Sequence, residues 1–166
     1  MTSSNIHLLE QGANLLAQLD DQLYLSAPAG ISKSGIGGHL RHCLDFYDGF
    51  LRGVKAGKVN YDLRERNELI EKDRFVAMTK IRETVDRLNE VSDSDDSDLL
   101  VKLEGEQAQS ESAWSRSSIN RELQFLLSHT VHHYALIAVL LRLQGFQPSP
   151  DFGVAPTTLK FWQAKA

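Results

Sequence analysis

The chain has 166 residues, of which 42% are hydrophobic and 24% charged, and its formal net charge is −4 at pH 7. These values are typical of a soluble globular chain and predict a single domain over residues 1–166. The absence of a basic run argues against nucleic acid or an anionic membrane as a partner. No stretch approaches the roughly 18 apolar residues of a membrane span, and the first residues lack a signal-peptide pattern. The single cysteine, Cys43, cannot form an internal disulfide, so the composition predicts a cytoplasmic protein.

The first third of the chain predicts two helices. Apolar residues recur with helical spacing over Ser4–Leu19 and again over Ile36–Val54. The connector Asp20–Gly35 contains proline, glycine and several serines, which favour a loop. Within this connector we expect Tyr24 and Leu25 to pack against the helices.

Two histidines lie near the start of the second predicted helix. His39 is closer to the apolar stripe, so periodicity favours it as the inward-facing residue. His42 lies at the boundary of the stripe, near Phe46. Cys43 points into the stripe, and we expect it to pack as a small hydrophobic residue, because no second cysteine is present to share a metal with it.

The linker Lys58–Asn67 follows this helix and carries alternating charges, which indicate a solvated segment. The alternative is that the linker folds over a site. Tyr61 and an arginine, Arg64 or Arg66, would then bind an anionic group, since the guanidinium fork suits carboxylates.

The next helix is predicted over Glu68–Val91, with Phe75 on its core face. The acidic run Ser92–Asp98 ends it. This run lacks the central glycine and the final glutamate of an EF-hand loop, so we expect a solvated loop and no calcium site.

Alternating apolar residues predict a short β-hairpin from Leu99–Glu104 and Glu111–Arg116. The longest apolar-rich segment, Ile119–Gln144, contains no glycine or proline and predicts a helix of about seven turns. Beyond it, Pro156–Trp162 predicts a last short helix, because proline is favoured in a first helical turn.

The long late helix carries a histidine pair that could bind a metal. His129 and His133 are four residues apart, which places them on one face, one turn apart. The helix is apolar nearly all round, so both should face the interior, whereas His132 should face a rim. The competing interpretation is two core histidines without a metal. With a histidine from the second helix, the pair would form a three-imidazole site suited to zinc, nickel or iron, with a coordination position left open.

Two motifs have a specific order and placement: Gly35–His42, which opens the second helix, and His129–His133 in the late helix. On these motifs the chain resembles the DinB-like (DinB/YfiT) superfamily, along essentially its whole length. The resemblance implies an all-α fold, a four-helix bundle with an unusual connection that is commonly dimeric and binds a divalent metal.

The resemblance also implies which residues bind the metal. The late pair is His129 and His133, and the third ligand is His42, which lies about two turns after the helix start. His39, favoured by periodicity, remains the alternative ligand. The sequence departs from many members at Tyr134–Leu136, where they have Arg-Gly-Gln, which points away from a thiol cofactor.

The function that the resemblance implies is that of a metal-dependent enzyme. Its metal would activate water or a thiol for hydrolase or transferase chemistry on a small-molecule substrate. Glu122, nearly two turns before His129, could orient a ligand or act as a base; a solvated or ion-paired glutamate is the competing interpretation. The alternatives are a non-catalytic metal-binding or stress-response bundle, and a dimerisation module with core histidines. We expect a homodimer, because the late helix is apolar on nearly every side.

Overall fold

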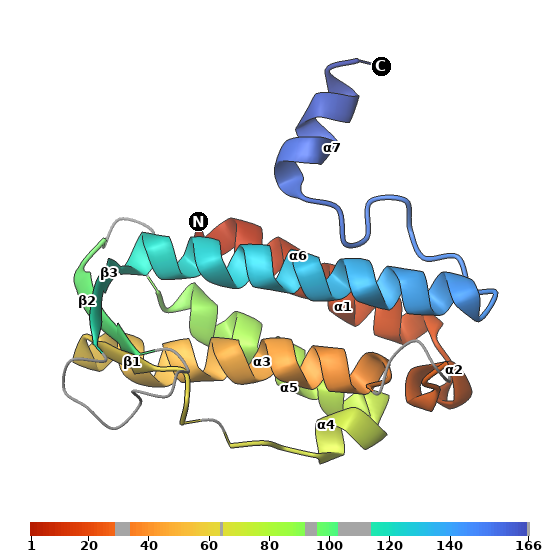
Figure 1. Ribbon diagram of the computed structural model, residues 1–166, viewed down its shortest axis with the longest axis horizontal. Coiled ribbons are helices and arrows are strands. Elements are labelled where there is room, and N and C mark those ends of the chain that lie inside the picture. The colour runs from red at the N-terminus through yellow and green to blue at the C-terminus, as the bar shows by residue number, and fades with distance from the viewer. Residues whose placement is uncertain (29–33, 64, 92–95, 103–113, 166) are drawn as a thin grey trace.

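The computed structural model describes residues 1–28, 34–63, 65–91, 96–102 and 114–165 (Figure 1). It is mostly helical with a small sheet, as the sequence predicted. The long helices are α1 (Thr2–Gln18), α3 (Ile36–Gly53), α5 (Arg74–Asn89) and α6 (Ile119–Leu143). The shorter ones are α2 (Asp21–Leu25), the 3-10 helix η1 (Val54–Ala56), α4 (Leu69–Lys72) and α7 (Pro156–Gln163). The strands in the described residues are β1 (Lys58–Asn60), β2 (Asp98–Lys102) and β3 (Ser115–Ser118).

The four long helices lie side by side and share one core (Figure 1). Both α1 and α3 contact α5 and α6. The core contains fully buried side chains from every one of these helices, because each carries apolar residues at helical spacing. They include Leu16 of α1, Phe50 of α3, Ile81 of α5 and Leu126 of α6.

Buried polar contacts join α1, α3 and α6 inside this core. Tyr47 Oη donates to Asn5 Oδ1 at 2.7 Å, and Asn5 Nδ2 donates to the Leu123 carbonyl at 3.1 Å. Thr130 Oγ1 lies 3.3 Å from Tyr47 Oη and donates to the Leu126 carbonyl at 2.8 Å. Because a buried polar group without a partner is destabilising, this polar network favours one register of the three helices.

The sheet has β2 at its centre, with β1 parallel to it on one side and β3 antiparallel on the other. The predicted hairpin is confirmed as β2 and β3, while residues 103–113 of the predicted segments lie outside the described residues. The third strand was not predicted, since β1 lies in the linker expected to be solvated; its Val59 is buried and pairs with Val101. The sheet lies where α3 ends and α6 begins (Figure 1).

The single helix predicted over Glu68–Val91 is wrong, because the chain breaks at Asp73 into α4 and α5. Asp73 has an extended backbone, with φ −138° and ψ 112°. Its Oδ1 accepts from the backbone N–H groups of Phe75 at 2.8 Å and Val76 at 3.2 Å, which caps α5. Phe75, expected in the core, lies in the first turn of α5 and is 57% exposed.

The connector Asp20–Gly35 contains α2, which the sequence did not predict. The Asp20 carboxylate caps α2 by accepting a backbone N–H at 2.7 Å. Tyr24 is buried, as predicted, and its hydroxyl donates to the Ile70 carbonyl. Leu25, expected to pack beside it, is 54% exposed.

The tail packs against α6 before α7 begins. Phe152 is buried and stacks on Tyr134, with the ring centroids 4.8 Å apart and the planes inclined by 14°. Gly153 has φ +73° and lies so close to α6 that a Cβ there would be 2.6 Å from the backbone nitrogen of Ala135. α7 forms where predicted and stands away from the other helices (Figure 1).

By its length and composition alone, α6 could cross a membrane. An 18-residue stretch of this helix has a mean hydropathy of 1.2, and 39% of it is buried inside the protein. The expectation that no segment approaches a membrane span therefore does not hold for α6. Core helices of soluble proteins can be equally long and apolar, and α6 packs against α1 and α3.

Gly12 and Tyr134 test how α1 packs on α6. A Cβ at Gly12 would overlap the Tyr134 hydroxyl, which is buried without a hydrogen-bond partner among the described residues. We expect Gly12→Ala to lower the free energy of unfolding by about 1–3 kcal/mol through overpacking. Tyr134→Phe should be neutral or stabilising, because it removes an unsatisfied hydroxyl, and should recover part of the Gly12→Ala loss. Urea unfolding of the single and double variants measures this, and strictly additive effects would contradict the contact.

Candidate metal centre

Three histidines from two helices meet where α3 packs against α6. His42 of α3 and His129 and His133 of α6 each offer a ring nitrogen, and these nitrogens all lie within 4.8 Å of one another. His129 Nε2 and His133 Nε2 are 3.2 Å apart. Two nitrogens bound tetrahedrally to one zinc ion at about 2.0–2.1 Å are themselves about 3.3 Å apart, so this pair fits. The group could therefore hold a metal ion.

The helices and the polar network determine which rings meet. His129 and His133 lie on one face of α6 because they are four residues apart. Thr130, next to His129, contacts Tyr47, which lies five residues after His42 on α3. The polar network thus fixes α3 against α6 within two turns of all three histidines.

Two further histidines adjoin this group. His39 Nδ1 lies 3.0 Å from His133 Nδ1, on the opposite side of the ring from Nε2. His132 is exposed, as predicted, and its ring meets that of His133 edge-on at 5.0 Å. Periodicity favoured His39 and the resemblance favoured His42 as the third member; His42 is the one that joins His129 and His133 in the three-nitrogen group.

Two phenylalanines flank the histidines. The Phe125 ring stacks on that of His129, with centroids 5.7 Å apart and planes inclined by 11°. The Phe46 ring lies 4.4 Å from that of His129 and 5.0 Å from that of His42. Neither phenylalanine was given a role in the site from the sequence. Their spacing could have indicated one, because each lies four residues from a histidine on the same helix and therefore on the same face.

Burial and crowding favour the uncharged form of His133 and His39. Burial, with smaller contributions from the neighbouring His129 and His42, lowers the pKa of His133 to about 3. Burial, followed by repulsion from His132, also lowers the pKa of His39. Neutral imidazole is the form that binds a metal, so His133 need not lose a proton to do so near pH 7.

Glu122 is held by hydroxyl groups and is buried. Tyr61 Oη donates to its Oε2 at 2.9 Å, and Ser117 Oγ donates to its Oε1 at 2.5 Å. The interpretation of Glu122 as a solvated residue is therefore wrong, and its hydrogen-bond partners within the described residues are hydroxyl groups rather than a cation. Tyr61 is buried as well, and burial, followed by the Glu122 carboxylate, raises the pKa of its phenol. The Tyr61 ring stacks on Phe46 at 5.3 Å, so it supports the wall of the site from within the core.

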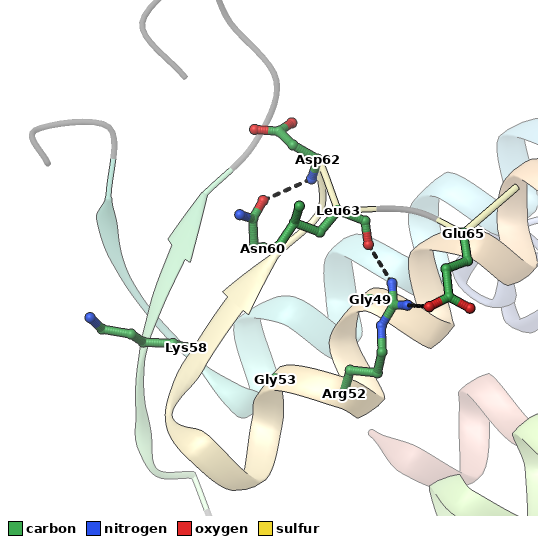
Figure 2. Close-up of a pocket in the computed structure, with 8 residues that line it drawn as sticks. All are labelled: Gly49, Arg52, Gly53, Lys58, Asn60, Asp62, Leu63 and Glu65. Atoms are coloured by element: carbon green, nitrogen blue, oxygen red, sulfur yellow. Dashed lines mark hydrogen bonds and ion pairs between the residues drawn. The ribbon is translucent and has the colours of Figure 1, made fainter. Parts of the chain in front are cut away.

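The described part of the linker after α3 is held at the far end of that helix. Figure 2 shows Arg52 donating to the Leu63 carbonyl and forming an ion pair with Glu65 at 3.7 Å. Arg64 lies outside the described residues, and Arg66 is exposed. The segment borders a cavity of about 590 Å³ that no histidine lines. Its lining residues are Gly49, Arg52, Gly53, Lys58, Asn60, Asp62, Leu63 and Glu65 (Figure 2).

Fold and site together define a helical protein with a three-histidine cluster between two of its helices, able to hold a metal ion. The family model of the DinB superfamily matches residues 10–137. The chain therefore belongs to the DinB superfamily, as its two histidine motifs predicted.

A relative from the fungus Rhizopus delemar, named FK506-binding protein 5, is 33% identical to the chain over 105 residues. The match covers 61% of the chain and 27% of that protein. The matched region thus makes up about a quarter of a longer protein.

Proposed function

We propose that the protein is a metal-dependent enzyme in which His42, His129 and His133 bind one divalent ion of zinc, nickel or iron. The observation that carries this proposal is the approach of their ring nitrogens to within 4.8 Å of one another. A divalent ion held by neutral imidazoles lowers the pKa of a bound water or thiol and so supplies a nucleophile at neutral pH.

The surroundings of the histidines support a site for a small molecule. Within the described residues, no fourth histidine, cysteine or carboxylate joins the group, which leaves a coordination position for water or substrate. Phe46 and Phe125 pack beside His129 and give the site an apolar side. This combination suits hydrolase or transferase chemistry on a small, partly apolar substrate.

For the fold, we propose the four-helix bundle of the DinB/YfiT type, with residues 1–166 as one domain. The contacts of α1 and α3 with both α5 and α6 support this assignment. The cytoplasm is the location we propose, on the composition of the chain and its single cysteine.

The metal content of the protein and of its histidine variants, measured by elemental analysis, tests which residues bind the ion. Protein purified without an affinity tag should contain about one divalent ion per chain. His133→Ala should abolish tight binding, because two imidazoles alone hold an ion weakly, whereas His7→Ala, an exposed histidine on α1, should retain it. Tight binding that is lost in His39→Ala and kept in His42→Ala would contradict the choice of ligand on α3.

Activity assays separate the enzyme from a non-catalytic metal-binding or stress-response bundle. We expect the metal-loaded protein to turn over at least one class in a panel of small esters, amides and thiol–electrophile pairs. Turnover should disappear on removal of the metal with a chelator and in His133→Ala. Full metal occupancy without turnover in any class would contradict an enzyme and favour the non-catalytic alternative.

We also propose a homodimer formed through α6. Leu136, Val139 and Leu143 are exposed on this helix at helical spacing, and a second copy would cover them with the same apolar stripe.

We expect Val139→Glu to shift the protein to the 18.6 kDa monomer in analytical ultracentrifugation, because the substitution would bury a charge in the contact. Phe75→Glu, which changes an exposed apolar residue on α5, is the matched control and should stay dimeric. A wild-type monomer at micromolar concentration would refute this arrangement.

A further inference from the structure

His133 makes a close polar contact through each of its two ring nitrogens. Its Nε2 lies 3.2 Å from Nε2 of His129, and its Nδ1 lies 3.0 Å from Nδ1 of His39. The rings of His39 and His133 are inclined by 45°, with their centroids 5.3 Å apart. A neutral imidazole carries one ring proton, so His133 donates through one of these nitrogens and accepts through the other.

Binding of a metal selects one of the two arrangements. The Nε2 side of His133 faces His129, so this nitrogen must be unprotonated if His133 is a ligand there. The proton then resides on Nδ1, and this N–H donates a hydrogen bond to Nδ1 of His39. His39 in turn keeps its own proton on Nε2, which leaves its Nδ1 free to accept.

We propose that His39 is a positioning residue that fixes the tautomer and the ring orientation of His133 by accepting a hydrogen bond from its Nδ1–H group. This inference rests on the proposed metal site. A metal-bound histidine usually has such an acceptor at its other nitrogen. His39 precedes His42 by three residues, so α3 supplies both a ligand and the acceptor that orients a ligand of α6.

The chemical nature of the acceptor has a consequence for the site. A carboxylate in this place would add a negative charge beside the ligands and offset part of the charge of the ion. His39 is a neutral acceptor that orients His133 without adding such a charge. An ion held in this way keeps more of its positive charge for an anionic or thiolate ligand.

Zinc affinity, measured by competition with a chromophoric chelator, tests this role. We expect His39→Leu to weaken zinc binding about 10–100-fold, the usual effect of losing such a partner. His39→Asn should recover most of the affinity, because its side-chain oxygen can accept the same hydrogen bond. His132→Leu is the matched control. The ring centroids of His132 and His133 are 5.0 Å apart, and no hydrogen bond joins the two rings in the described residues. This variant should therefore bind zinc like the wild type.

Nuclear magnetic resonance of the zinc-loaded, ¹⁵N-histidine-labelled protein gives a second readout that a general loss of stability would not produce. The Nδ1 proton of His133 should be observed and slowly exchanging in the wild type and in His39→Asn, and absent or fast-exchanging in His39→Leu. Wild-type protein that binds none of zinc, nickel and iron would overturn both the proposed function and this inference. Zinc binding and an Nδ1 proton that His39→Leu leaves unchanged would overturn this inference alone. Zinc binding lost equally in His39→Leu and His39→Asn, but kept in His42→Ala, would make His39 a ligand and overturn it too.

Discussion

The histidine cluster depends on the position of α3 along α6, and the buried contacts among Asn5, Tyr47 and Thr130 set that position. A slide of one residue along a helix moves a side chain by about 1.5 Å and turns it by about 100°, which would separate rings that now meet. Apolar side chains of similar size tolerate such changes, because one can replace another in the core. A buried hydrogen bond is more selective, since a displaced donor loses its acceptor. The polar network therefore gives the apolar core the precision that a metal site needs.

α3 makes two chemically different contacts with its neighbours. Toward α5 it presents Asp48, whose carboxylate meets Arg87 at 2.7 Å and Lys80 at 3.5 Å. Toward α6 it presents imidazole and phenyl rings, among them His42 and Phe46. The first contact balances charges at a partly solvated edge, and the second gathers neutral donors beside apolar walls. One helix thus supports the fold with one face and builds the candidate site with the other.

The long helices could be predicted because their apolar residues recur at helical spacing, and α6 could be predicted best because nothing interrupts it. The residues of the candidate site were harder to predict. His39 and His42 point within about 60° of each other on α3 and both contact His133. Periodicity favoured His39 because it measures only closeness to the apolar stripe, whereas His42 is the residue whose nitrogen joins the three-nitrogen group. The partners of Glu122 could not be predicted at all, since Tyr61 is distant in sequence and meets it only through the tertiary fold. The break at Asp73 likewise depends on a side chain that competes with the helix for backbone N–H groups.

The end of the chain has two parts, and only the first of them, which packs on α6, contributes to the core. Phe152 and Gly153 pack on Tyr134 and Ala135, the two residues that follow His133. The residues of α7 bury no side chain fully, and Phe161 and Trp162 are exposed. A truncation at about residue 155 would therefore spare the core, whereas one that removes Phe152 would uncover the ring of Tyr134 beside the candidate site. For protein engineering, a tag or fused domain attached at α7 would therefore stay clear of the packed core.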